Sequence, residues 1–158
     1  MITSCRFDNR LPGLSYSFNT DVAPLHDFDV VVQERNATDR NKGQQHGVWP
    51  TYSYMGGMEI HIEGDLLADD SDDFVVKKIA LINALRPDPN LPVTDRSHGT
   101  FVVRFDNTTE AWKTDVIMTA FSAPRAPEQY AWTAFLITWF SWNPWFVGEF
   151  SGQKYYWS

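Results

Sequence analysis

The chain has 158 residues, a formal net charge of -7 and a single cysteine, Cys5. A chain of this length buries roughly 70% of the surface that its unfolded form exposes, so we expect one domain with its own core. The negative charge argues against tight binding of nucleic acid, because affinity for phosphates comes from Lys and Arg. One cysteine excludes an internal disulfide and a zinc site built from cysteines.

No segment indicates export or membrane insertion. The amino-terminal residues MITSCRFDNRLPG lack the apolar run of a signal peptide, so we expect synthesis in a reducing cytoplasm. The uncharged stretch 131–147 is long enough to test as a membrane span, but Thr, Ser, Asn and Pro interrupt it. Its β-branched and aromatic residues favour strands instead.

The first 34 residues contain three short runs of strand composition separated by turn residues. These runs are CRFDN, SYSFN and DFDVVVQE. Residues 35–50 are polar, show little periodicity and predict a long loop. Loops of that length are uncommon in compact domains and often functional, so this one is a candidate for reaching a neighbouring subunit.

The stretch MEIHIEGD, residues 58–65, alternates strictly between apolar and polar side chains. The apolar face holds Met58, Ile60 and Ile62, and the polar face holds Glu59, His61 and Glu63. This alternation predicts a half-buried strand. Its polar face is either a functional row or the solvated side of a sheet.

A run of aspartates between Asp69 and Asp73 precedes an apolar pattern with steps of three and four residues. Carboxylates accept hydrogen bonds from free N–H groups and favour the positive end of a helix. The sequence therefore predicts one helix over residues 71–86, stopped by Pro87. Its single apolar stripe would hold Phe74, Val75, Ile79, Leu81, Ile82 and Leu85. A calcium loop is the alternative for the aspartates, but the ligand spacing, glycine and closing glutamate of an EF-hand are absent.

The rest of the chain adds further strand-like runs, namely GTFVVRFDN, DVIMTAFSAP, AWTAFLITWFSWNP and finally KYYWS. Many strands and one helix predict a mostly β fold of the α+β class, a β-sandwich with one flanking α-helix. We treat residues 1–158 as a single domain of this kind.

Glu59 and Glu63 raise an enzymatic alternative. The stretch EIHIE resembles the E-x-D-x-E strand of laminarinases and lichenases, which are β-sandwich glycosidases, with His61 in place of the Asp. Retaining glycosidases need two carboxyl groups about 5 Å apart, whereas glutamates four residues apart on a strand start about 13 Å apart at Cα. Because any half-solvated strand shows this alternation, we expect no catalytic residues and no enzyme.

Metal and cofactor sites are not indicated. The histidines, which are His26, His46, His61 and His98, have no short ligand spacing. The sequence also lacks a G-x-S-x-G elbow and a phosphate-binding loop. We therefore expect no metal and no cofactor.

Tryptophan is dense near the carboxyl end, and both faces of the segment 132–142 are apolar. One face holds Trp132, Ala134, Leu136, Phe140 and Trp142, and the other holds Phe135, Ile137 and Trp139. Such a strand needs cover on both sides, from the helix, a loop or another subunit. Because Trp is a preferred interface anchor, the interface hypothesis names four residues: Trp139, Trp142, Trp145 and Phe146. Simple burial in the core and a sugar-binding module are the alternatives.

Several segments occur together in a recognisable order. GMEIHIEGD is followed by the acidic helix start DDSDDF, the helix VVKKIALINAL and Arg86-Pro87. GTFVVRFDN, Glu110, Asp115-Val116, Ser122-Ala123-Pro124 and FLITWFSWNPWFVG come next. Residues 56–148 thereby resemble the ring-forming domain of the distal tail protein family of long-tailed (siphovirus-like) phages, whose ending is W-x-x-x-(D/N)-P-(Y/W)-F-V-G. Residues 1–55 fit it only in general character.

The resemblance implies a tail-tube-like sandwich, six copies of which form a ring between the tail tube and the tail-tip hub. It implies a structural protein of the virion tail tip or baseplate, made in the host bacterial cytoplasm and without catalysis. Its partners would be its own copies in a homo-hexamer, the tail tube protein and hub or fibre proteins. DNA would pass through without specific binding, helped by carboxylates that repel phosphates. Ten residues follow Gly148, where the family often carries a carbohydrate-module-like domain, so the resemblance implies a minimal ring-former.

Overall fold

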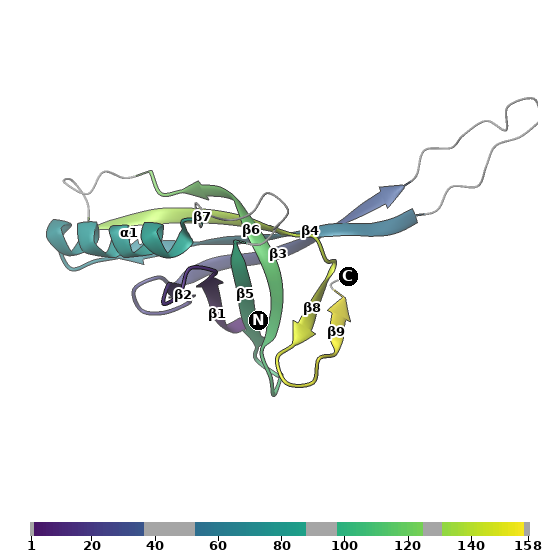
Figure 1. Ribbon diagram of the computed structural model, residues 1–158. Helices are drawn as coiled ribbons and strands as arrows, with labels where there is room; N and C mark the ends of the chain where they lie inside the picture. The colour runs from purple at the N-terminus through teal and green to yellow at the C-terminus, as the bar shows by residue number, and fades with distance from the viewer. Residues whose placement is uncertain (1, 37–52, 88–97, 125–130, 157–158) are drawn as a thin grey trace, which may run out of the picture.

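The computed structural model describes residues 2–36, 53–87, 98–124 and 131–156, which form nine strands and one helix (Figure 1). The strands are β1 (Ile2–Asn9), β2 (Ser15–Phe18), β3 (Leu25–Asn36), β4 (Ser53–Leu67), β5 (Gly99–Phe105), β6 (Trp112–Ser122), β7 (Trp132–Ser141), β8 (Trp145–Gly148) and β9 (Lys154–Tyr156). The helix, α1, spans Ser71–Leu85. The prediction of a mostly β, α+β fold with one flanking helix is confirmed for these residues.

The strands form two antiparallel sheets that share β6. Sheet A runs β2-β1-β5-β6, continuing through β8 to β9, and sheet B runs β6-β7-β4-β3. The first half of β6 pairs with β5 and its second half, from Ile117, pairs with β7. A bulge between Met118 and Ala120 marks this change of partner. Bulges bend a strand, and a strand that passes from one sheet to the other makes a corner of a sandwich.

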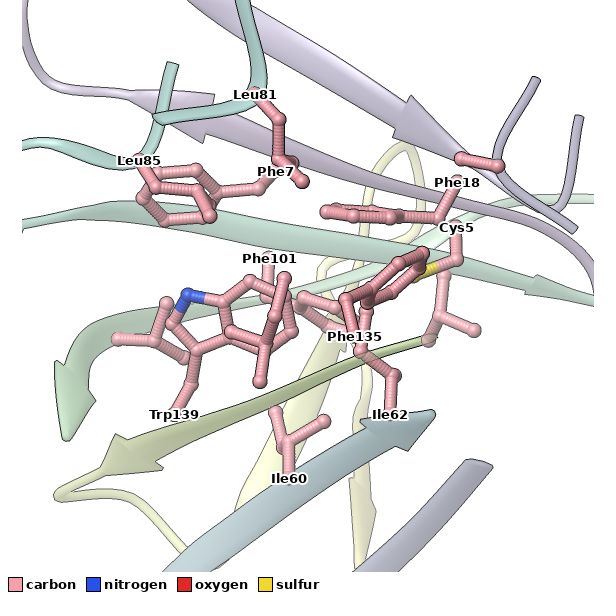
Figure 2. Packing of buried hydrophobic residues seen from close by; sticks show 14 of the residues in the cluster. Cys5, Phe7, Phe18, Ile60, Ile62, Leu81, Leu85, Phe101, Phe135 and Trp139 are labelled. Carbon is pink, nitrogen blue, oxygen red and sulfur yellow. The ribbon is translucent and has the colours of Figure 1, made fainter. Parts of the chain in front are cut away.

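The core lies between the inner faces of the two sheets and is built around Trp139 (Figure 2). The Trp139 ring lies 5.0 Å from Phe101 and 5.7 Å from Phe7, measured between centroids. Ile60 and Ile62 from β4 are fully buried in the same cluster. The alternation predicted for residues 58–65 is therefore confirmed, with the isoleucines inside and the glutamates outside.

Helix α1 is held at both ends by side chains. At its start the Asp70 carboxylate accepts a hydrogen bond from the Asp73 N–H (2.8 Å), and Asp73 accepts one from the Asp69 N–H (3.0 Å). Lys77 lies 2.8 Å from Asp73, and its hydrogen bond lowers the pKa of that carboxyl. At its end the Asn9 side chain donates to the Ala84 and Arg86 carbonyls. The aspartates thus cap the helix as predicted.

The prediction of a single apolar stripe on α1 was wrong. Phe74, Leu81 and Leu85 are buried, whereas Val75, Ile79 and Ile82 are exposed. Each residue turns the helix by 100° about its axis. Around that axis the three buried side chains lie within about 40° of one another, and the three exposed ones lie about 80–140° from Phe74. Six apolar residues therefore make two neighbouring stripes, because the core is wide enough to cover only one.

The ends of β3 and β4 extend beyond the body of the molecule as a paired arm (Figure 1). β3 continues to Asn36, so the first two residues of the predicted loop belong to a strand. Residues 37–52, which hold the rest of that predicted loop, lie outside the described residues. Contact between this loop and a neighbouring subunit therefore stays a prediction.

Candidate functional site: the outer face of sheet B

The outer face of sheet B carries a row of carboxylates on β3 and β4. Alternation puts every second side chain on this face, opposite the buried isoleucines of β4. The carboxylates are Asp27, Asp29, Glu59, Glu63 and Asp65. No Lys or Arg occurs on this face within 27–31 of β3 or 59–67 of β4. The row is therefore an acidic surface, and we call it the acidic row.

Two histidines are the basic side chains beside the acidic row. His61 Nε2 lies 3.3 Å from Glu59 Oε2, and its Nδ1 lies 3.1 Å from Thr138 Oγ1. His26 Nε2 lies 2.6 Å from Asp65 Oδ2 at the edge of the sheet. Each imidazole can neutralise one carboxylate when protonated. Among the described side chains, the other carboxylates of the row, Asp27, Asp29 and Glu63, have no histidine partner.

The register of the sheet places Glu59 and Glu63 apart. Glu59 lies opposite Phe140 of β7, and Glu63 lies four residues further on, opposite Leu136. At the strand rise this separates their Cα atoms by about 13 Å. His61 lies between them and is engaged with Glu59. This geometry does not bring the two carboxylates together at the roughly 5 Å spacing of a retaining glycosidase.

No group of three or more His, Cys, Asp or Glu in the described part of the chain is arranged to hold a metal ion. His98 lies apart from the acidic row, where its Nδ1 accepts a hydrogen bond from the Met118 N–H (3.3 Å). Partial burial lowers the pKa of His98. His46 lies outside the described residues.

An apolar row, formed by β7 and the residue directly after it, lies beside the acidic row. Its members are Trp132, Ala134, Leu136, Phe140 and Trp142, which are exposed or half-buried. The Phe140 and Trp142 rings meet edge to face with centroids 5.0 Å apart. The prediction that segment 132–142 has two apolar faces is confirmed. One face fills the core, and the other is on the surface beside the carboxylates.

The interface hypothesis was wrong for two of its four residues. Trp139 and Phe146 are both 0% exposed, because they pack inside the protomer and cannot touch another subunit. Trp142 is 48% exposed and stays a candidate. Trp145 is half-buried. Its ring centroid lies 5.5 Å from that of Tyr156 and 4.3 Å from Lys154 Nζ.

A scan against protein-family models and a search of curated proteins give no match to this chain. The arrangement of side chains therefore carries the functional argument. No helix within the described ranges is long and apolar enough to cross a membrane.

Sequence reasoning missed the structural role of Glu110. Its carboxylate accepts hydrogen bonds from the Phe150 N–H (2.9 Å), the Ser151 N–H (3.0 Å) and the Ser151 hydroxyl (2.6 Å). These bonds lower the pKa of Glu110, those from Ser151 most. A Cβ at Gly148 would lie 2.6 Å from Glu110 Oε1, so a larger residue there would displace this carboxylate from its hydrogen bonds. Glu110 lies 40 residues from Phe150 in the sequence, and no periodic pattern links the two.

The clamped turn presents Phe150 to solvent, where its side chain is 85% exposed. Aromatic side chains are common anchors in protein interfaces, so Phe150 is a candidate contact residue. The turn between β8 and β9 lies at the opposite side of the molecule from α1 (Figure 1). Apart from its aromatic side chain, no sequence pattern indicates that Phe150 is exposed in this way.

Proposed function

We propose that this chain is a structural protein of a phage tail, six copies of which close into a ring between the tail tube and the tail-tip hub. The acidic row is the observation that carries this proposal. In the proposed ring, the outer face of sheet B lines the channel. Its carboxylates repel the phosphates of DNA, so the genome passes without binding.

The edges of sheet B support a ring of identical copies. In the described part of the chain β3 pairs only with β4, and β6 beyond Met118 pairs only with β7. Unpaired strand edges are sites where another chain can add a strand. Because sheet B has four antiparallel strands, its two edges run in opposite directions. The β3 edge of one copy can therefore pair antiparallel with the β6 edge of the next.

Head-to-tail contacts of this kind use two different surfaces and close into a ring when the rotation between copies permits it. The partners proposed beyond the ring are the tail tube protein on one side and hub or fibre proteins on the other. The proposal places the protein in the virion tail tip and assigns it no catalysis, metal or cofactor.

Light scattering after size exclusion, combined with negative-stain imaging, tests this proposal. We expect a particle with six times the 18.2 kDa mass of the chain and a central hole in projection. The measurement should cover a wide range of protein concentrations, because association depends on concentration. A single 18.2 kDa species at every concentration, and in the presence of tail tube protein, would contradict the proposal.

A further inference from the structure

The exposed apolar side of α1 is a surface that the sandwich leaves uncovered. Its residues are Val75, Val76, Ile79 and Ile82, with exposed fractions of 37%, 66%, 52% and 44%. We call them the helix stripe. Contiguous apolar surface on a protein of this size marks an interaction site more often than isolated exposed residues do.

Lys78 shows which neighbour the helix stripe adjoins. Its ammonium group donates a hydrogen bond to the Ala123 carbonyl (3.0 Å), directly after the end of β6. On a helix with 3.6 residues per turn, Lys78 lies between buried Phe74 and exposed Ile82. The helix stripe is therefore on the side of α1 that faces the β6 edge of sheet B.

The opposite edge of sheet B carries a hollow. A cavity of about 420 Å³ opens beside the first residues of β3. Its apolar walls come from Ile2, Leu25, Phe28 and Phe105, and its polar rim from Asn19, His26 and Asp27. We call it the β3 hollow.

The strand register puts the helix stripe and the β3 hollow at the same height on the two edges. Across sheet B, Asp27 pairs with Glu63, Glu63 with Leu136, and Leu136 with Ser122. Asp27 is on the rim of the β3 hollow, and Ser122 is next to Ala123, which Lys78 contacts. A neighbouring copy that continues the sheet sideways therefore brings hollow and stripe together without a shift along the strands.

We propose, on the basis of the proposed ring, that the helix stripe of one copy packs into the β3 hollow of the next. The stripe projects and is apolar, whereas the hollow is recessed and has apolar walls, so the two surfaces are complementary. Lys78 beside the stripe and Asp27 on the rim of the hollow carry opposite charges. Two different complementary surfaces on opposite sides of one subunit are what a head-to-tail contact requires.

Cross-linking between copies tests this contact. A chain carrying both Ile79→Cys and Asp27→Cys is treated with a short bismaleimide and separated on a denaturing gel. Burial raises the pKa of the native Cys5 thiol, so Cys5 stays unreactive in the folded protein. We expect a ladder of covalent oligomers. The matched control combines Asp27→Cys with Thr109→Cys, because Thr109 is exposed in the turn between β5 and β6, outside the helix stripe, and should give no ladder.

A second pair of variants measures the same contact without cross-linking. Ile79→Lys should lower the oligomer population at least tenfold at a fixed concentration, whereas Thr109→Lys, at an exposed position outside the helix stripe, should leave it unchanged. Both positions are exposed, so both variants should keep the circular dichroism spectrum and melting temperature of the monomer. This check separates loss of contact from loss of fold.

The outcomes separate this contact from the proposed function. Suppose that wild type forms oligomers, that the Ile79→Lys variant still forms them, and that the double-cysteine variant gives no ladder. These results would overturn the contact and leave the ring proposal standing. A ladder that ends at a size other than six supports the contact and contradicts the hexamer. A wild-type chain that stays monomeric at all concentrations, together with no ladder from the double-cysteine variant, overturns both.

Discussion

Asp27 on β3 lies directly opposite Glu63 on β4, so two carboxylates face each other across the outer face of sheet B. Like charges in direct cross-strand register destabilise a sheet. The fold keeps this pair in the middle of an acidic row although the chain already carries a net charge of -7. We infer that the acidic row is present for the function of this surface and does not stabilise the protomer.

Replacing one member of this pair should therefore stabilise the isolated protomer. Glu63→Lys turns a repulsive cross-strand pair into an attractive one, and we expect the free energy of unfolding to rise by about 0.5 kcal/mol in low salt. Urea unfolding followed by Trp fluorescence measures this change. The gain should shrink in 1 M salt, where exposed charges are screened.

Glu149→Lys is the matched control, because it makes the same charge change at an exposed position in the β8–β9 turn, outside the acidic row. An equal gain from both variants would show that net charge, and not the Asp27 pair, sets the effect.

Trp139 should behave as a core residue and not as an interface residue. Trp139→Ala removes a fully buried ring that contacts Phe7 and Phe101, so we expect a loss of about 3–5 kcal/mol in the free energy of unfolding. Trp142→Ala removes a 48% exposed ring and should cost about 1 kcal/mol or less. Chemical denaturation of both variants checks this contrast. Similar losses at the two positions would contradict the assignment of Trp139 to the core.

The indole N–H of Trp139 is buried without a hydrogen-bond partner in the described part of the chain. An unpaired buried donor costs about 1–3 kcal/mol. Trp139→Phe removes this donor while keeping an aromatic ring, so its loss of stability should be smaller than that of Trp139→Ala. The same denaturation experiment measures it. A Phe variant as unstable as the Ala variant would contradict this expectation, because keeping an aromatic ring would then bring no gain in stability.

Local patterns in the sequence predicted most of the fold. The alternation of residues 58–65 and the capped helix start at Asp70 depend on neighbours within a few positions, and both are confirmed. The two apolar faces of segment 132–142 were also predictable. Which face would be buried was not, because that depends on where the β7 side chains meet Phe7 and Phe101 of sheet A.

The candidate site depends on contacts between distant segments, and the sequence predicted less of it. The polar face of residues 58–65 was visible, but its extension by Asp27 and Asp29 follows from the pairing of β3 with β4. The exposed helix stripe was missed because its residues obey the same three- and four-residue spacing as the buried ones. The Glu110 clamp joins residues 40 apart and has no local signature.

The Glu110 clamp should loosen in acid. Hydrogen bonds lower the pKa of the folded carboxyl, so its contribution to the stability of the turn is present above the ordinary Glu pKa and is lost as pH falls through the lowered pKa. We expect the Phe150 and Ser151 amide protons to be protected from exchange at neutral pH and to change chemical shift together as Glu110 is protonated. NMR titration measures both.

Glu110→Gln should remove this titration and weaken the protection of both amides at neutral pH. Glu149→Gln is the matched control, since Glu149 is exposed and is next to Phe150 in the sequence. Amide shifts that titrate unchanged in the Glu110 variant would assign the effect to another carboxyl.

Reversing the charge of the acidic row should turn a non-binding surface into one that binds DNA. Asp29→Lys, Glu59→Lys and Glu63→Lys together add six charges and change the net charge from -7 to -1. Wild type should show no affinity for duplex DNA in a gel-shift or anisotropy assay at low salt. The triple variant should bind, with a slope of log affinity against log salt of about -0.9 for each phosphate contacted.

The matched control makes the same change of six charges away from the row, by Asp21→Lys, Asp106→Lys and Glu149→Lys, all at exposed positions. The three substitutions within the acidic row place three cations close together on neighbouring strands of one surface. If this surface lines a channel, the three cations can contact several phosphates of one duplex at the same time. The scattered cations of the control cannot do this, so its affinity and salt slope should stay smaller. Equal binding by the two triple variants would show that net charge governs passage of DNA and that the position of the acidic row does not, which would remove the main support for a channel lined by sheet B.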